Sequence, residues 1–279
     1  MRIIRTVGEL RTWSREMRKA GNTIGLVPTL GALHEGHISL VRAAKADCTA
    51  VAVSIFVNPT QFGPNEDFLR YPRTFDADCA MLVAEDVDVV FAPVPEEIYK
   101  PGAATFVEVD GLSDRLDGAS RPGHFRGVAT VVAKLFIAAE PDRAFFGQKD
   151  GAQVAVLRRM TTDLGLPVEL VVCPIVREAD RLAMSSRNRY LSPEERRQAL
   201  VLSRALQLVR DMYVAGGTSA HELIAAAQSI FSEEPAVRID YIAAVDWTTL
   251  LPVEEVGPGT LFAVAAYLGN TRLIDNFVF

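Results

Sequence analysis

The first half of the chain alternates short apolar runs with longer amphipathic runs. Runs that are nearly continuously apolar predict strands buried on both faces of a parallel sheet. They cover residues 23–27, 49–57, 87–91, 143–146 and 168–172. Apolar residues at helical spacing predict helices before and between these strands, over residues 6–20, 38–46, 76–85, 128–139 and 153–164. This order is typical of a Rossmann-like, doubly wound α/β domain that binds its ligand at the carboxyl ends of the strands.

Other segments of this half lack a regular pattern. Residues 58–65 and 93–101 are dense in turn residues, and residues 111–127 are polar and glycine-rich, so we expect loops there. Residues 105–109 alternate between apolar and polar, which predicts an edge strand.

The pattern changes near residue 175. A serine, a proline and two glutamates at 192–195 are typical of a helix N-terminus, and a second helix is predicted over 220–231. Strand-like runs follow at 238–245, 260–267 and 271–278. We therefore expect a Rossmann-like, ligand-binding domain at 1–175 and a smaller C-terminal α+β domain at 176–279 that acts as a lid.

Composition and charge narrow the class of protein. The 279 residues are 49% hydrophobic and 23% charged, typical of a globular protein, and the formal net charge of −6 gives no general attraction to nucleic acid or anionic membrane. Cys48, Cys79 and Cys173 are far apart, which favours free thiols in a reducing compartment. No apolar run is long enough to span a bilayer. We expect a soluble, cytoplasmic protein without a nucleic-acid or membrane partner.

The stretch TLGALHEGH at 29–37 carries the first candidate site. It joins a predicted strand to a predicted helix, and its glycines let the backbone approach a ligand closely. A helix N-terminus binds anions through its unpaired N–H groups, and His34 and His37 add imidazole donors there. We interpret this loop as a phosphate site. Zinc binding and simple helix capping are the alternatives; zinc is disfavoured because the histidines are three residues apart rather than four.

Three further segments carry polar groups suited to a nucleotide and a small acid. In GQKD at 147–150, the lysine can reach a phosphate and the aspartate a ribose hydroxyl. The hydroxyls and guanidinium of MSSRNR at 184–189 suit polyphosphate oxygens. Gln61 in NPTQF, with Gln153, can hold a hydroxylated substrate. Taken singly, GQKD is equally consistent with a solvated turn, and the two glutamines with polar residues that end a turn or face water. MSSRNR alone would be interpreted as a domain linker with surface charges.

The HxGH pattern resembles the nucleotidylyltransferase superfamily. Four segments together resemble the pantothenate synthetase family in order and spacing, and the likeness extends nearly from residue 1 to the closing LGNTRLIDN. These segments are VPTLGALHEGH, SIFVNPTQFGPNEDF, FFGQKD and VREADRLAMSSRNRYLS.

The resemblance implies a ligase that uses ATP to join pantoate to β-alanine through pantoyl adenylate, releasing AMP and pyrophosphate. It implies catalytic roles for His34, His37 and Lys149, and pantoate contacts from Gln61 and Gln153 with Asn58 nearby. The ATP-binding positions that it implies are Leu30, Gly31, Ala32, Leu33, His34, Glu35, Gly36, His37, Gly147, Gln148, Lys149, Asp150, Val176, Met184, Ser185, Ser186 and Arg187. Mg²⁺ would arrive with the ATP phosphates, without a dedicated metal site, and the protein would form a homodimer through its larger domain.

Some positions depart from the family pattern. Leu30 replaces the usual methionine, Ala152 a glutamine and Arg181 a glycine, and Met81 is less polar than its counterparts. Arg121 and His124 match a family segment near the active site without a defined role. Two other functions remain as alternatives: an adenylyltransferase with a phosphorylated acceptor, and a non-catalytic nucleotide sensor.

Overall fold

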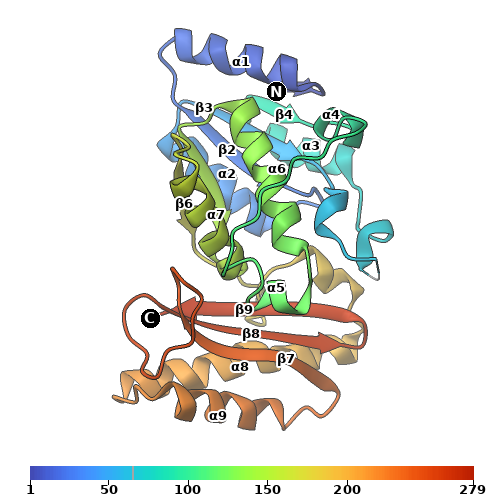
Figure 1. The fold of residues 1–279 in the computed structure, drawn as a ribbon. Helices are drawn as coiled ribbons and strands as arrows, with labels where there is room; N and C mark the ends of the chain where they lie inside the picture. The colour runs from blue at the N-terminus through green and yellow to red at the C-terminus, as the bar shows by residue number, and fades with distance from the viewer. Residues whose placement is uncertain (65) are drawn as a thin grey trace. The chain divides into compact units, whose positions relative to one another are not determined.

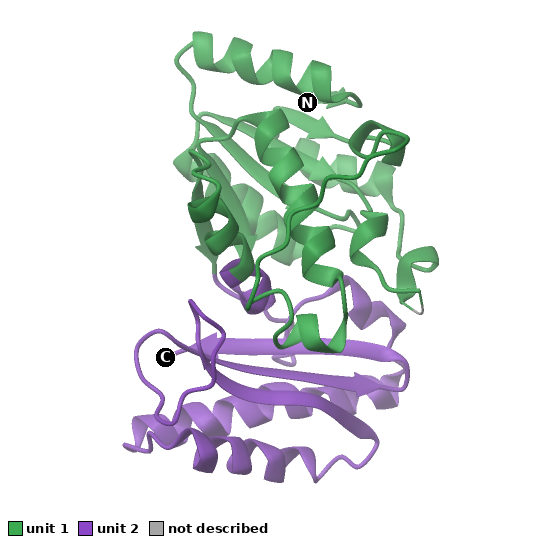
Figure 2. Ribbon diagram, viewed as in Figure 1, with its two compact units in different colours: residues 1–147, 156–173 green, residues 148–155, 174–279 purple. Residues whose placement is uncertain are grey.

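The computed structural model describes residues 1–64 and 66–279; Asn65, in the loop predicted at 58–65, lies outside the described residues. Contacts divide the chain into two compact units (Figure 2). Unit 1 comprises residues 1–147 and 156–173, and unit 2 comprises residues 148–155 and 174–279. The segment 148–155, placed in the larger domain by sequence, therefore groups with the second unit.

Unit 1 is built on a parallel sheet with the order β1-β4-β3-β2-β5-β6. Its strands are β1 (Arg2–Ile4), β2 (Ile24–Thr29), β3 (Ala50–Ile55), β4 (Val89–Phe91), β5 (Arg143–Gly147) and β6 (Glu169–Cys173). From β2 the chain winds outward through β3 to β4, and it then returns to the other side of β2 with β5. The order thus reverses between β2 and β5, the place where doubly wound sheets bind ligands.

Helices cover both faces of this sheet, as the doubly wound prediction requires. Phe145 of β5 packs in the cluster that includes Val41 of α2 and Leu82 of α3, whereas Phe146 contacts Phe136 of α6. Figure 1 shows α2 behind the sheet and α6 in front of it. The helices are α1 (Val7–Lys19), α2 (Glu35–Asp47), α3 (Phe75–Ala84), α4 (Pro95–Ile98), α5 (Asp117–Ser120), α6 (His124–Ala139) and α7 (Gly151–Asp163), with 3₁₀ turns η1 (Pro59–Gln61), η2 (Asp67–Leu69) and η3 (Gln148–Asp150).

Three predictions in unit 1 are wrong. Residues 105–109 form no strand, because the Val107 N–H is bonded to Thr130 Oγ1 of α6 (2.9 Å) and β1 occupies the sheet edge beside β4. The predicted loop at 111–127 contains α5 and the first turn of α6, which begins at His124 rather than at 128. Within the predicted irregular segment 93–101, Pro95 occupies the first position of the short helix α4.

Unit 2 is the α+β structure expected from sequence. An antiparallel sheet of the order β7-β8-β9 packs against α8 and α9, with Leu202, Leu223 and Phe262 in its core. Its elements are η4 (Ser186–Tyr190), α8 (Pro193–Val214), α9 (Ala220–Phe231), β7 (Val237–Asp246), β8 (Thr260–Leu268) and β9 (Thr271–Val278). Ser192 and Glu195 form a reciprocal capping box at the start of α8. Among the helices of the described residues, none has both the length and the apolar character that a membrane span needs.

Candidate active site

The loop between β2 and α2 has a backbone that the sequence and one buried acid hold in place. Gly31 and Ala32 both adopt left-handed conformations (φ +83° and +51°), and a Cβ on Gly31 would lie 3.0 Å from Ile55 Cγ2. Asp78 of α3, only 2% exposed, accepts hydrogen bonds from the N–H groups of Ala32 (3.0 Å) and Leu33 (2.9 Å). Thr74 Oγ1 donates to the same carboxylate (3.0 Å). Asp78 therefore fixes the loop that precedes the histidines.

The two histidines lie together at the start of α2. His34 is the N-cap residue, its ring centroid lies 4.0 Å from that of His37, and its N–H donates to His37 Nδ1 (3.3 Å). Both residues are half-buried. The first turn of α2 adds its own N–H groups and the positive end of the helix dipole, so this arrangement suits a phosphate.

The neighbouring predicted ATP positions differ in how their side chains are used. Leu33 is buried in the core (3% exposed), and the Glu35 carboxylate forms an exposed ion pair with Arg42. Leu30, where the family usually has methionine, is half-buried. Within this stretch the imidazoles and the backbone are thus the groups best suited to a ligand.

Gln61 is oriented by a fully buried asparagine. Asn58 Nδ2 donates to Gln61 Oε1 (3.0 Å) and to the Gly127 carbonyl (3.2 Å), while its Oδ1 accepts from the Tyr99 hydroxyl (2.8 Å). With 0% exposure and these partners, Asn58 acts on Gln61 rather than on solvent. Gly127 makes this packing possible, because a Cβ there would lie 2.3 Å from the Thr60 carbonyl oxygen.

A second set of polar side chains holds the backbone of Gln61. His124 Nδ1 donates to the Gln61 carbonyl (2.8 Å), His124 Nε2 accepts from Arg121 (3.0 Å), and Arg121 binds both oxygens of Glu66 (2.8 and 2.6 Å). Burial and the Arg121 charge lower the pKa of His124 to about 4, so its ring is neutral at physiological pH. Burial alone would raise the pKa of Glu66, but the Arg121 hydrogen bonds and charge outweigh it and lower the pKa. Arg121 and His124 thus acquire a structural role that their sequence did not reveal.

In unit 2, the GQKD segment presents Lys149 and Asp150 side by side. Lys149 Nζ lies 3.3 Å from Asp150 Oδ1, and these side chains are 22% and 45% exposed. Gln153 follows on α7 and is half-buried. Ala152, which replaces the family glutamine, is 3% exposed, so a small apolar side chain suits its surroundings.

Residues 176–184 fold back as a narrow hairpin that brings together two of the predicted ATP-binding positions, Val176 and Met184. The Met184 N–H donates to the Val176 carbonyl (3.0 Å), and the Glu178 N–H to the Leu182 carbonyl (2.9 Å). The turn places Arg181 at φ +74°, the position of a three-residue hairpin loop that favours glycine. The family glycine at this position thus has a conformational reason, and the Arg181 side chain bonds Gln207 (3.1 Å) on the exposed surface.

The Ser-Ser-Arg segment forms the 3₁₀ turn η4. Ser185 is its N-cap, and its hydroxyl accepts from the Arg187 N–H (3.3 Å). Ser186 is 6% exposed, while Ser185 and Arg187 are half-buried. Asn188 Nδ2 ties this turn to the hairpin through Glu178 Oε1 (2.6 Å) and the Ala183 carbonyl (3.1 Å).

The structure thus groups the predicted residues within each unit. Unit 1 positions the histidine loop, Asn58 and Gln61; unit 2 positions Lys149, Asp150, Gln153 and the 176–187 segment. Residues 1–64 and 66–279 contain no cluster of three or more His, Cys, Asp or Glu side chains arranged to hold a metal ion. Sequence reasoning missed Asp78 and Glu66. A signal existed for Asp78, an acid on the helical stripe shared with Phe75 and Leu82.

The parallel sheet with its reversed strand order, and the HxGH loop that leads from β2 into a helix, define an α/β protein of the nucleotidylyltransferase kind. A family model takes the identification further. The chain belongs to the pantoate-beta-alanine ligase family, whose model matches residues 2–278.

Individual proteins agree with this assignment over their full lengths. The chain is 63% identical to the pantothenate synthetase of Acidobacterium capsulatum, covering 99% of this chain and 96% of that protein. It is also similar to the crystal structure of pantothenate synthetase from Thermus thermophilus (TM-score 0.94, 47% identity, 100% and 99% of the two chains). A third likeness is to the pantoate-beta-alanine ligase of Francisella tularensis, solved with beta-gamma ATP and beta-alanine (TM-score 0.77, 33% identity, 100% and 97%).

Proposed function

We propose that this chain joins pantoate to β-alanine in two steps, with ATP as the source of energy and pantoyl adenylate as the intermediate. In the first step a pantoate carboxylate oxygen attacks the α-phosphorus of ATP, and pyrophosphate leaves. In the second step the β-alanine amine attacks the acyl carbon, the bond between that carbon and the AMP oxygen breaks, and the amine loses a proton. The family assignment over residues 2–278 carries this proposal.

The residues of unit 1 would bind phosphate and pantoate. His34, His37 and the N-terminal N–H groups of α2 stabilise negative charge on the phosphates, and a protonated His37 donates its proton to the departing pyrophosphate. Gln61 binds pantoate through its side-chain amide, while Asn58 holds that amide in position from its buried site. This assignment replaces a direct contact between Asn58 and pantoate with a positioning role.

The residues of unit 2 would act on the same ATP. Lys149 stabilises charge near the α-phosphate, Asp150 holds the ribose together with Gly147 of unit 1, and Gln153 contacts pantoate. Val176 and Met184 lie against the adenine, and Ser185, Ser186 and Arg187 bind the outer phosphates. One observation within unit 1 supports a shared ligand: β2 and β5 are paired parallel strands, so the histidine loop and the GQKD segment leave the sheet at the same edge.

The proposal also covers the metal ion, the cellular compartment and oligomeric state, and the movement of the C-terminal unit. Mg²⁺ bound to the ATP phosphates would neutralise charge during phosphoryl-type transfer. The chain would act in the cytoplasm as a homodimer formed through its larger domain. The C-terminal unit, which contains the Ser-Ser-Arg turn, would close as a lid over bound ATP.

An isotope experiment tests the intermediate. Pantoate labelled with oxygen-18 in its carboxylate is incubated with ATP, Mg²⁺, β-alanine and the protein, and the AMP is analysed by mass spectrometry. Transfer of one labelled oxygen into AMP is expected, because that oxygen bridges the acyl carbon and the α-phosphorus in the adenylate. Label in inorganic phosphate instead would indicate an acyl phosphate, and unchanged ATP would indicate a nucleotide-binding protein without this activity.

A further inference from the structure

The last strand of unit 2 contains an asparagine whose side-chain amide forms hydrogen bonds with the segment that carries Lys149. Asn276 lies in β9 and is 3% exposed. Its Nδ2 donates to the carbonyls of Gln148 (2.9 Å) and Lys149 (2.8 Å), and its Oδ1 accepts from Gln148 Nε2 (3.4 Å). Both amide hydrogens therefore hold consecutive carbonyls, one of them on Lys149 itself.

A second side chain of unit 2 anchors the same segment two residues later. Trp247 Nε1 donates to the Gly151 carbonyl (2.8 Å). The absence of a side chain at Gly151 leaves room for Leu261 and Asn276, because a Cβ there would lie 3.0 Å from Leu261 Cδ1 and 3.3 Å from Asn276 Nδ2. The GQKD segment thus follows β5 in the chain, but its backbone is held by side chains from β9 and from the end of β7.

The residue before Asn276 fixes the position of this part of β9. Asp275, whose side chain is 1% exposed, accepts two hydrogen bonds from Arg177 (2.7 and 3.0 Å) and one from the Asn276 N–H (2.8 Å). Arg177 also bonds the Arg181 carbonyl (3.1 Å) across the hairpin. The motif LIDN at 273–276, quoted above only for its resemblance, thus contacts two segments proposed to bind ATP.

We propose that Asn276 is a positioning residue that sets the location of the Lys149 ammonium for adenylate formation, an inference that rests on the role of Lys149 proposed above. Asparagine suits this position because it alone combines the required length with two donors and one acceptor. Aspartate has the same shape but presents only acceptors to two carbonyls. Serine is too short to reach both.

A double-mutant cycle tests this coupling through the rate of pantoate-dependent pyrophosphate release. Asn276→Asp and Asn276→Ser are each made in the parent chain and in a Lys149→Ala background. We expect each Asn276 change to lower kcat about 30-fold in the parent and less than about threefold in the Lys149→Ala background, because its effect passes through Lys149. Asn270→Asp, a change of the same chemistry at an exposed turn of the β8–β9 hairpin, serves as the matched control and is expected to leave the rate unchanged.

The outcomes separate this inference from the proposed function. An equal fold-loss of kcat in the parent and in the Lys149→Ala background would overturn the positioning role. Asn276 would then affect the structure of unit 2 as a whole and would not act through Lys149. Full activity of Lys149→Ala would instead refute the proposed role of the lysine. If Asn276→Asp fails to fold, Asn276→Ser introduces no buried charge and decides the question, with folding checked by circular dichroism.

Discussion

The loop that carries the histidines depends on Asp78, and this dependence can be measured. The Asp78 carboxylate is 2% exposed and accepts from two loop N–H groups and from the Thr74 hydroxyl. It lies in the first turn of α3, where the helix dipole favours a negative charge. Asp78→Asn keeps the shape of the side chain but turns one acceptor oxygen into a donor, so one loop N–H loses its partner.

The size of the effect follows from these contacts. A hydrogen bond to a charged group contributes about 1.5–3 kcal/mol, and an unpaired buried donor costs about 1–3 kcal/mol. Removing a buried charge offsets part of the loss because its desolvation penalty disappears. We therefore expect Asp78→Asn to lower the free energy of unfolding by about 2–4 kcal/mol. We also expect it to lower kcat/KM for ATP at least about tenfold, since the histidines are displaced.

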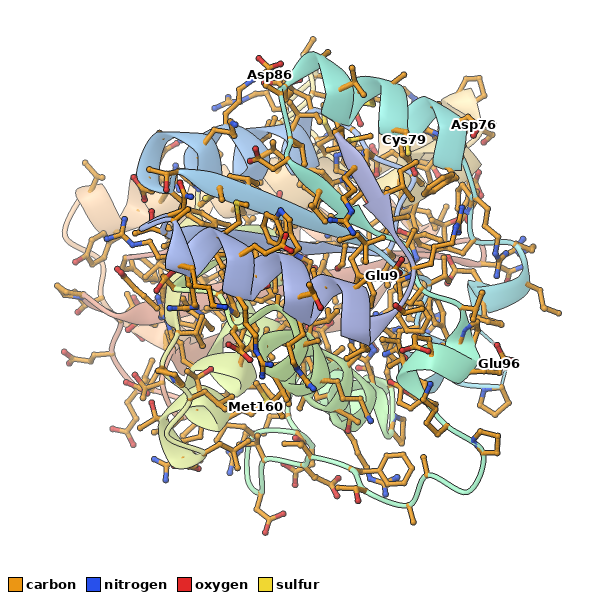
Figure 3. All side chains as sticks on the ribbon, turned by 90° about the horizontal axis from the view of Figure 1, so that it is seen from above. Glu9, Asp76, Cys79, Asp86, Glu96 and Met160 are labelled. Carbon is orange, nitrogen blue, oxygen red and sulfur yellow. The ribbon has the colours of Figure 1, made fainter. Side chains whose placement is uncertain are left out.

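Urea unfolding and initial-rate kinetics measure the two quantities. Asp76→Asn is the matched control, because Asp76 lies in the same helical turn but is exposed, as its position on the outer side of α3 shows (Figure 3). This control is expected to change stability by less than about 1 kcal/mol. If Asp78→Asn behaves like Asp76→Asn in both assays, Asp78 does not hold the loop.

The remaining predictions concern His124, Gly127 and Arg181. Burial lowers the pKa of His124 from its ordinary value of 6.5 to about 4 in the folded protein. The free energy of unfolding is therefore expected to fall by about 3 kcal/mol as the pH drops from about 6.5 to about 4, because the unfolded chain binds a proton in this range and the folded protein does not. His124→Asn keeps a donor for the Gln61 carbonyl and should show a shallower loss over that range in pH-dependent urea unfolding. Gly127→Ala should lower the free energy of unfolding by about 1–3 kcal/mol and raise KM for pantoate, because its methyl group would meet the Thr60 carbonyl. Arg181→Gly should raise the free energy of unfolding by about 0.5–1 kcal/mol, because glycine adopts the left-handed conformation at this position without the strain that a side chain causes.

The predictions for His124, Gly127 and Arg181 can each be checked against a control variant or a result that would contradict them. Parallel stability curves of His124→Asn and the parent between about pH 6.5 and 4 would refute the histidine assignment. The other charged groups that face His124 are Arg121, Glu66 and Asp117, and all three are present in both proteins. Gly8→Ala, in α1 with no atom within 4 Å of the added Cβ, should be neutral or stabilising. Lower stability of Arg181→Gly would show that the Gln207 hydrogen bond outweighs the strain.

Hydrophobic pattern predicted the elements of unit 1 that are buried on both faces. The strand at 143–146 is one example, because Phe145 and Phe146 pack against opposite layers, so that apolar residues follow one another from Ala144 to Phe146. The three residues of β1 are too few to show any pattern. The start of α6 was missed because Gly127, which is typical of a loop, is required there by a close approach to the η1 backbone.

The candidate site likewise contains some residues that the sequence reveals and others that only the structure reveals. The groups proposed to contact ligand, such as His34, His37 and Lys149, lie in short local motifs that the sequence displays. Its positioning groups act over long separations: Asn276 holds a carbonyl 128 residues earlier in the chain, and Arg121 binds a carboxylate 55 residues away. Local patterns contain no information on such pairs, since only the fold brings their members together.

The central claim is that the chain forms pantoyl adenylate before β-alanine reacts. The most direct measurement is pyrophosphate release from ATP and Mg²⁺ in the presence of pantoate alone, followed by addition of β-alanine. The account predicts a pantoate-dependent burst stoichiometric with enzyme, and then sustained release with formation of pantothenate and AMP once β-alanine is present. Pyrophosphate release that is independent of pantoate, or absent until β-alanine is added, would contradict it.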